Sequence, residues 1–393
     1  MFTFFSRFFV VAAAAILMAL ISSCETRPSA AKSRLGLEAL THAYNFATAI
    51  HEDPDDKARS QAMVVVDMAE LGWCDEALAR VGRINGWHQG TALADVAYHL
   101  ARTGRSDEAR PLLTKAVAVA KLAKDWYEPR IYAHVAQARA ALGEVDQAEA
   151  LSKGMDRDEF FKVTTAAAAG FAQAGKFEEA MARLHALDDS KHFEATWPRT
   201  MGYLHIAQQP ELRNDQRDQA LLAARRSANT TIGPRRTDAL IAVADAYRKS
   251  GNGKTAQDVL ELVSVGLKPE ELDAQRRHFS IAGLAGAWGR LGQRQRAVSL
   301  LQGSLSCLDR MQDIDRPIAC ALVAGAYADA GEHERAWAVY QQAVTLAGTL
   351  KNARPRALAL VEICRSVGRH QLEFLPEIRQ QLDQLLKGLA PKS

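Results

Sequence analysis

Apolar residues recur at helical spacing along most of the chain. Ala336, Tyr340 and Ala343, for example, stand at positions i, i+4 and i+7 and so share one face of a helix. We find no convincing run of the strict apolar/polar alternation that marks a half-buried strand. The pattern predicts an all-α protein.

A short polar turn interrupts these helical segments at regular intervals. In each copy a glycine is followed five residues later by an alanine, and successive copies lie about 37 residues apart. The clear copies are Gly72/Ala77, Gly104/Ala109, Gly143/Ala148, Gly175/Ala180, Gly251/Ala256, Gly292/Ala297 and Gly331/Ala336. A degenerate copy has Asp215 and Ala220, and a last copy starts at Gly368 with Glu373 in place of the alanine. Glycine suits the end of a helix because it accepts positive φ there.

The residues before each turn are also periodic. An alanine often stands seven positions before the glycine, and an aromatic residue often stands four before it, as at Phe171, Tyr247, Trp288 and Tyr327. A proline lies 13 to 17 positions before several turns, near the first turn of the leading helix, where its missing N–H costs nothing. The repeated unit is therefore helix, tight turn, helix and longer loop, about nine times.

This unit resembles the tetratricopeptide repeat (TPR). The best copy has Ala324, Tyr327, Gly331, Ala336 and Tyr340 in the order and spacing of that family. The resemblance covers roughly residues 55–370 and implies a right-handed α-solenoid whose inner groove binds proteins or peptides. The mean period exceeds the family's 34, and several copies lack the aromatic residue, so a related HEAT-type helical hairpin stays open.

The two ends of the repeat array have the pattern of terminal caps. Residues 34–50 predict one amphipathic helix, and a second begins at Pro376 with Ile378 and Leu382 on its apolar side. Terminal repeats of a solenoid need a polar outer face to stay soluble. We therefore expect residues 34–393 to form one solenoid with a capping helix at each end.

The first residues indicate export and a lipid anchor. Residues 1–23 hold one charge, Arg7, before an apolar run too short to span a bilayer, which is typical of a signal peptide. The run ends in Leu-Ile-Ser-Ser-Cys at residues 20–24, which resembles the lipobox of bacterial lipoproteins. That resemblance implies cleavage before Cys24, lipidation of Cys24, and a tether over residues 24–33. Glu25 favours the periplasmic face of the outer membrane if the bacterium has two membranes. A plain secretory signal is the alternative.

Composition excludes some partners and shows no cofactor site. The 393 residues include 49 Lys and Arg against 46 Asp and Glu, a net charge of +3, which disfavours a nucleic-acid partner. The remaining cysteines, Cys74, Cys307, Cys320 and Cys364, match no zinc spacing, and a bridge between Cys307 and Cys320 is a weak hypothesis. We expect no metal and no cofactor.

Three further motifs fail as sites. The string at 251–255 (Gly-Asn-Gly-Lys-Thr) lacks the earlier glycine of a phosphate-binding loop, since residue 248 is arginine. His185, Asp188, Asp189 and His192 have no recognised metal-ligand spacing. No G-x-S-x-G elbow occurs.

The family resemblance also indicates where a partner would bind. In tetratricopeptide proteins the leading helix of each pair lines the groove, which places groove positions six, three and two residues before each turn. Most residues at the first two offsets are small. The larger ones are the candidate partner contacts: Tyr98, Arg102, Gln137, Gln173, Asp245, Arg248, Lys249 and Arg290.

These observations favour a lipid-anchored envelope scaffold that binds a protein or peptide and is not an enzyme. An envelope enzyme with its site in the groove, or an accessory part of a secretion or assembly complex, is the alternative.

Overall fold

The computed structural model is built from helices. It describes residues 30–124, 126–151, 155, 157–187, 195–267, 274–306, 308 and 311–389. Those residues form nineteen helices and no strand, which confirms the all-α prediction. None of the described helices is both long and apolar enough to cross a membrane. The signal segment, Cys24 and most of the proposed tether lie outside the described residues.

Most helices form pairs that follow one another along the chain. The leading helices are α3 (Pro54–Glu70), α5 (Trp87–Arg102), α7 (Tyr127–Ala141), α9 (Arg157–Gln173), α11 (Thr196–Ala207), α13 (Pro234–Lys249), α15 (Ala274–Arg290), α17 (Arg316–Asp329) and α19 (Ala353–Arg369). The second helices are α4 (Cys74–Val81), α6 (Ser106–Leu122), α8 (Val145–Ala150), α10 (Phe177–Ala186), α12 (Asn214–Thr230), α14 (Gly253–Gly266), α16 (Arg294–Leu305) and α18 (His333–Thr349). Two further helices stand at the ends, α2 (Ala30–Thr48) and α20 (Pro376–Lys387).

Glycine turns connect the helices in seven of the eight sequential pairs, as the sequence predicts. All seven turn glycines have φ between 74° and 91°, a conformation that costs a residue with a side chain about 1–2 kcal/mol. After Gly331, the Glu332 N–H donates to the Tyr327 carbonyl over 2.9 Å, which satisfies a carbonyl at the end of α17. The alanine five residues after each glycine is at most 1% exposed, because it packs where the paired helices approach closely.

In the degenerate copy between α11 and α12, an arginine side chain stabilises the connection in place of a glycine. The connection has no glycine and no residue with positive φ. Instead, the Arg217 guanidinium donates to the carbonyls of Ala207, Gln209 and Leu212 over 3.2–3.4 Å. One arginine side chain thus satisfies carbonyls that a glycine turn would otherwise cap.

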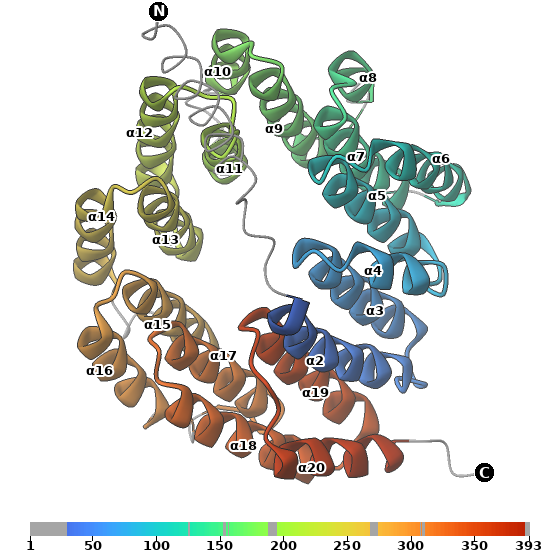
Figure 1. The fold of residues 1–393 in the computed structure, drawn as a ribbon, viewed down its shortest axis with the longest axis vertical. Coiled ribbons are helices and arrows are strands. Elements are labelled where there is room, and N and C mark those ends of the chain that lie inside the picture. Colours follow the sequence, from blue (N-terminus) through green and yellow to red (C-terminus); the bar gives the residue numbers. More distant parts are fainter. Residues whose placement is uncertain are drawn as a thin grey trace, which may run out of the picture.

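The leading helices also pack on one another, so the pairs are arranged around a ring (Figure 1). In that view α10, α12, α14, α16 and α18 lie on the outside, and α9, α11, α13, α15 and α17 lie on the inside. The aromatic residues four before the turns, from Phe171 to Tyr327, are at most 6% exposed and fill the space between successive pairs.

The two ends of the chain meet and close the ring. Helix α2 packs along α19 as extensively as the helices of the sequential pairs pack on each other, and it also contacts α3. It therefore occupies the place of a second helix for α19, and the expectation that residues 34–50 form a polar-faced terminal cap is wrong. Leu40 and Phe46 of α2, and Ile50 just after it, are at most 1% exposed. Helix α20 lies against α18 and α2.

Close backbone contact explains Gly368, which the sequence analysis assigned to a ninth turn. Gly368 lies inside α19, and the residue with positive φ is Gln371 at 51°. A methyl group on Gly36 would come within 2.6 Å of the Gly368 carbonyl oxygen, and one on Gly368 within 2.8 Å of the Leu40 side chain. The two glycines let α2 and α19 approach closely where no turn connects them.

Ion pairs join the first elements to the last. The Asp67 carboxylate on α3 accepts from Arg365 Nε over 2.6 Å and from Arg369 Nη2 over 2.6 Å, both on α19. The side chains of Asp67 and Arg365 are 2% and 7% exposed, so this pair is buried. We call these contacts, together with the α2–α19 packing, the seam.

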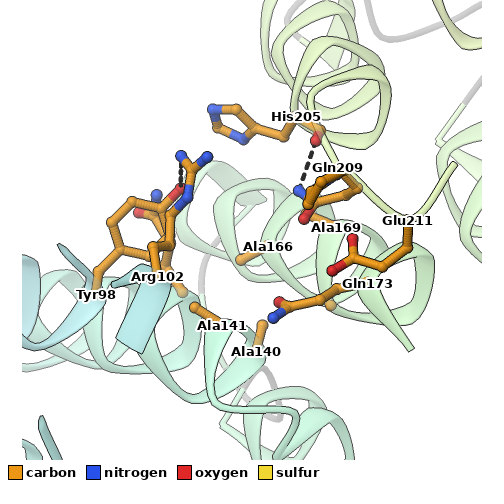
Figure 2. A pocket seen from close by; sticks show the side chains of 13 residues that line it. Tyr98, Arg102, Ala140, Ala141, Ala166, Ala169, Gln173, His205, Gln209 and Glu211 are labelled. Atoms are coloured by element: carbon orange, nitrogen blue, oxygen red, sulfur yellow. Dashed lines mark hydrogen bonds between the residues drawn. The ribbon is translucent and has the colours of Figure 1, made fainter. Parts of the chain in front are cut away.

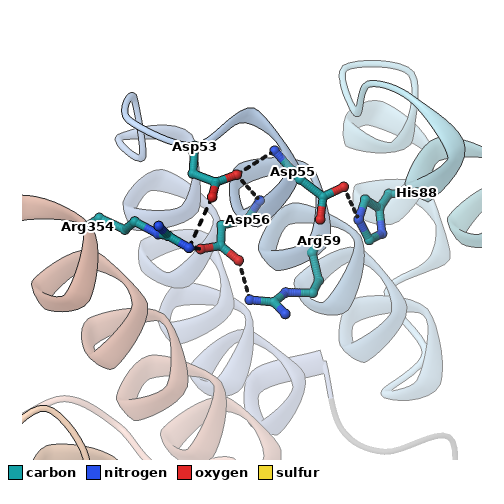
Figure 3. A network of polar contacts seen from close by, with 6 residues as sticks. All are labelled: Asp53, Asp55, Asp56, Arg59, His88 and Arg354. Carbon is teal, nitrogen blue, oxygen red and sulfur yellow. Dashed lines mark hydrogen bonds and ion pairs between the residues drawn. The ribbon is translucent and has the colours of Figure 1, made fainter.

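A second group of seam contacts lies at the start of α3 (Figure 3). Arg354 Nε of α19 donates to Asp56 over 2.6 Å, and its Nη2 lies 3.0 Å from Asp53. Asp53 also caps α3, because its Oδ1 accepts from the backbone N–H groups of Asp55 and Asp56. These hydrogen bonds and the nearby Arg354 hold the pKa of Asp53 below its ordinary value, although slight burial acts to raise it.

Candidate functional site

Four of the eight predicted contact residues line one hollow on the leading helices (Figure 2). Tyr98 and Arg102 come from α5, Gln137 from α7 and Gln173 from α9. The cavity has a volume of about 140 Å³, and its floor is made of small residues, Ala140, Ala141, Ala166, Ala169 and Gly170. We call this hollow the amide pocket.

Arg102 is the cation of the amide pocket. Its Nη1 donates to the Tyr98 hydroxyl over 3.2 Å, and its guanidinium carbon lies 5.7 Å from the centroid of the Tyr98 ring. No carboxylate pairs with Arg102 among the described residues, and its side chain is exposed. The ring holds the guanidinium in place and leaves its remaining donors for a ligand.

The far side of the amide pocket was missed in the sequence. His205 on α11 and Gln209, Pro210 and Glu211 beyond it complete the lining. Gln209 Nε2 donates to the His205 carbonyl over 2.7 Å. Burial, and then the charge of Arg102, lower the pKa of His205, so its imidazole is neutral near pH 7. These residues lie before Asp215 and Ala220, in the copy without a turn glycine, so counting back from a glycine could not number them.

The other four predicted residues lie together elsewhere and pair with one another. Asp245 contacts Arg248 at 3.0 Å, Lys249 at 3.1 Å and Arg290 at 3.3 Å, and Arg290 also pairs with Asp329. Burial acts to raise the pKa of Asp245, but Arg290, Lys249 and Arg248 together lower it. The cluster links α13, α15 and α17, so these charges stabilise the stacking of leading helices.

Several small residues expected on an open groove floor are in fact contact points between helices. A methyl group on Gly286 would lie 2.8 Å from Asp329 Oδ2, and one on Gly289 would lie 2.7 Å from the Ala330 backbone nitrogen. At Gly325 the nearest atom, on His370, would be 2.4 Å away. At Gly289 the clash would be with backbone, so glycine is needed there for close packing of α15 on α17. At Gly286 and Gly325 the neighbouring atoms belong to side chains that can move, and only part of the predicted floor lines a hollow.

A larger hollow lies across the seam. Its volume is about 440 Å³, and its charged lining comes from both ends of the chain. That lining is Arg59, Asp67, Glu70, Asp95, Arg130, His134, Lys162, Arg365 and Arg369, with Trp87 and His88 beside it. We call it the seam hollow. A third cavity of about 260 Å³, with Phe279, Ile318 and Leu322 in its apolar lining, shares Arg365 and Arg369 with it.

The remaining motifs of the sequence have structural roles. Asn252 caps α14, since its Oδ1 accepts from the Thr255 N–H over 3.1 Å, so the string at 251–255 is a repeat turn. Cys74, Cys320 and Cys364 are free and buried, and burial raises the pKa of Cys320 to about 12. Cys307 lies outside the described residues, as do Asp188, Asp189 and His192. Within the described part, no group of three or more His, Cys, Asp or Glu side chains is placed to hold a metal.

Comparison with known proteins does not assign the chain to a family. No protein-family model matches the chain, and no curated protein matches it.

Proposed function

We propose that the chain is a scaffold of the cell envelope, anchored through a lipid on Cys24, that binds a protein or peptide on its leading helices. Its role is binding without catalysis and without a cofactor, and nucleic acid is not its partner. In a bacterium with two membranes it would lie on the periplasmic face of the outer membrane. The lipobox-like residues 20–24 and Glu25 support the anchor and the location.

The amide pocket is the observation that carries the binding role. Three successive leading helices place Tyr98, Arg102, Gln137 and Gln173 around a floor without large side chains. Glutamine amides donate to and accept from peptide groups, and an arginine without a carboxylate partner binds a carboxylate in bidentate fashion. This set of groups suits a polypeptide segment that has both a main chain and an acidic group to offer.

The fold supports the same role. We infer that the pairs are TPR-like repeats in a right-handed array of nine, the ninth being formed by α19 and α2. The buried turn alanines, the positive φ of the glycines and the buried aromatic residues are consistent with that repeat. Helical repeats of this kind are stiff because each pair packs on its neighbours, and they present extended binding surfaces.

An affinity pull-down from detergent-solubilised envelope tests the binding role. The wild type is compared with the double variant Arg102→Glu/Gln173→Ala, and Arg110→Glu on α6 is the matched control. We expect a partner that the wild type and the control recover and the double variant loses. Recovery by all three would contradict binding in the amide pocket, and recovery by none would contradict the scaffold role.

Metabolic labelling with a fatty acid tests the anchor separately. We expect the wild type to incorporate the label and to sediment with membranes, and Cys24→Ser to do neither. Equal labelling of the two proteins would contradict lipidation at Cys24.

A further inference from the structure

The ion pairs around the seam hollow are layered, with the acids behind the cations. The Asp56, Asp67 and Glu159 side chains are 8%, 2% and 8% exposed. Their partners Arg59, Arg369 and Lys162 are 52%, 49% and 47% exposed. A molecule in the hollow therefore meets the cations first, although the pairs are balanced in charge.

Ion pairs on the second helices have either order. Arg294 is 65% exposed over Glu332 at 12%, and Arg110 is 51% exposed over Glu144 at 19%, but two other pairs are reversed. Asp75 is 83% exposed over Arg105 at 32%, and Glu76 is 44% exposed over Arg80 at 19%. The seam hollow differs in that three cation-outward pairs place Arg59, Lys162 and Arg369 around one cavity. Glu70 is the exposed acid that does line the hollow.

Each of these buried acids also has more than one cation. Asp56 pairs with Arg59 and Arg354, and Asp67 pairs with Arg365 and Arg369. Of the Asp67 pair, Arg365 is 7% exposed and Arg369 is 49% exposed. Both cations of Asp56 are about half exposed, Arg59 at 52% and Arg354 at 43%, and Arg354 joins α19 to α3. The exposed cation can therefore bind an external anion while the buried acid keeps a partner.

The hollows follow one another along the leading helices. The seam hollow shares Arg365 and Arg369 with the cavity beyond it. On the other side, Asp95 and His134 of the seam hollow lie three residues before Tyr98 and Gln137 of the amide pocket, about one turn along α5 and α7. A ligand that contacts all three hollows must therefore be an extended molecule.

We propose that these hollows bind an acidic segment of a polypeptide, with the seam hollow as its main anchor. The inference rests on the proposed function and specifies the chemistry of its partner. Guanidinium groups bind carboxylates through two parallel hydrogen bonds, and a broad, open hollow suits a chain better than a small enclosed ligand. Because Asp67 and Arg369 come from opposite ends of the chain, only the closed ring assembles the site.

Fluorescence polarisation of the full-length chain in detergent tests this directly. The probe is a labelled twelve-residue peptide of alternating Glu and Ser, and its counterpart has Gln in place of Glu. The test variant is Arg59→Gln/Arg369→Gln, in which Asp56 keeps Arg354 and Asp67 keeps Arg365. The control is Arg110→Gln on α6, whose partner Glu144 keeps Arg139. A thermal melt of each variant checks that the ring is intact.

We expect the wild type to bind the Glu peptide at least tenfold more tightly than the Gln peptide at low salt. The double variant should lose at least tenfold in affinity, since it removes two guanidinium groups that would form charge-assisted hydrogen bonds with the Glu carboxylates. The control should stay within about twofold of the wild type, as expected for an outer pair that no ligand touches.

Several results would overturn the inference. Equal affinity for both peptides, no binding of either, or unchanged binding by the double variant would each do so. Displacement of the Glu peptide by pyrophosphate at lower concentration than by unlabelled Glu peptide would indicate a small oxyanion site instead. The protein could fail to bind the Glu peptide while the pull-down still recovers a partner that depends on Arg102 and Gln173. That result would overturn the acidic nature of the ligand but not the proposed function.

Discussion

The sequential pairs and the closing pair solve the same packing problem with different means. In α17–α18 a glycine turn connects two helices, and the buried Ala336 and Tyr340 pack between them. In α2–α19 no turn connects the helices, and about 330 residues separate the facing glycines Gly36 and Gly368. There, facing glycines bring the backbones together and a buried ion pair fixes α19 on α3. Where covalent connection is missing, specific polar contacts and close backbone approach take over its role.

Removal of α2 should destabilise the closing pair more than any other change proposed here. Deleting residues 1–50 takes away Leu40, Phe46 and Ile50, each contributing on the order of 1.5–3 kcal/mol of burial. We expect hydrogen exchange to become fast in α19 while α9 and α10 keep their protection. A peptide of residues 30–53 added in trans should restore protection in α19. Unchanged exchange in α19 after the deletion would show that α2 does not complete the last pair.

Breaking the buried ion pair comes next. Asp67→Ala leaves Arg365 buried without its main partner, and we expect a loss of about 3–5 kcal/mol in the free energy of unfolding. The matched control is Asp75→Ala, whose exposed pair with Arg105 should be worth about 0–1 kcal/mol. Denaturant titration measures both. A similar small loss in the two variants would mean that the seam pair is no more important than a surface pair.

Two positions with positive φ can be compared, one occupied by glycine (Gly331) and one by a residue with a side chain (Gln371). Gly331→Ala should cost about 1–2 kcal/mol, because a side chain at φ 74° is strained. Gln371→Gly should instead stabilise by up to about 1 kcal/mol, since Gln371 already has φ 51°. Melting temperatures of the two variants should move in opposite directions. A fall in both would show that the positive φ of Gln371 does not strain the chain.

The smallest effect should come from an ion pair between sequential leading helices. His134 Nδ1 lies 2.6 Å from Asp95, and although burial acts to lower the pKa of His134, Asp95 raises it above its ordinary value of about 6.5. The stabilisation is therefore complete below about pH 6.5 and disappears as pH rises through the raised pKa.

The measurement is the melting temperature of Asp95→Asn relative to the wild type across pH. We expect the difference to be largest near pH 5.5 and to shrink by pH 9, with Asp258→Asn on α14 as an exposed control. A difference that stays constant with pH would contradict the charged pair.

The repeat pattern predicted the structure of each helix–turn–helix unit, which depends on residues close in sequence. Gly331, Ala336 and Tyr327 lie within ten residues of one another, so their spacing alone indicates a helix, a turn and a second helix. The same spacing misassigned Gly368, because a glycine needed for contact with α2 looks like a glycine needed for positive φ. Ring closure depends on contacts such as Asp67–Arg365, which no periodicity encodes.

The candidate site was likewise predicted only in the part that the repeat spacing determines. Counting back from each turn glycine identified Tyr98, Arg102, Gln137 and Gln173, which share one pocket because the repeats place equal offsets side by side. The count could not include His205, whose copy has no glycine. Nor could it separate Arg102, which has no acidic partner in the described chain, from Arg290, which is held by Asp245 and Asp329.

Distance measurement between α2 and α19 tests the closed ring most directly. Spin labels on the exposed Asn45 of α2 and Lys351 just before α19, attached to non-natural side chains so that the native cysteines stay unaltered, report the spacing by double electron–electron resonance. The closed ring predicts one narrow population at the short spacing of paired helices, whose axes lie about 8–10 Å apart. A broad distribution reaching the width of an open arc would contradict it.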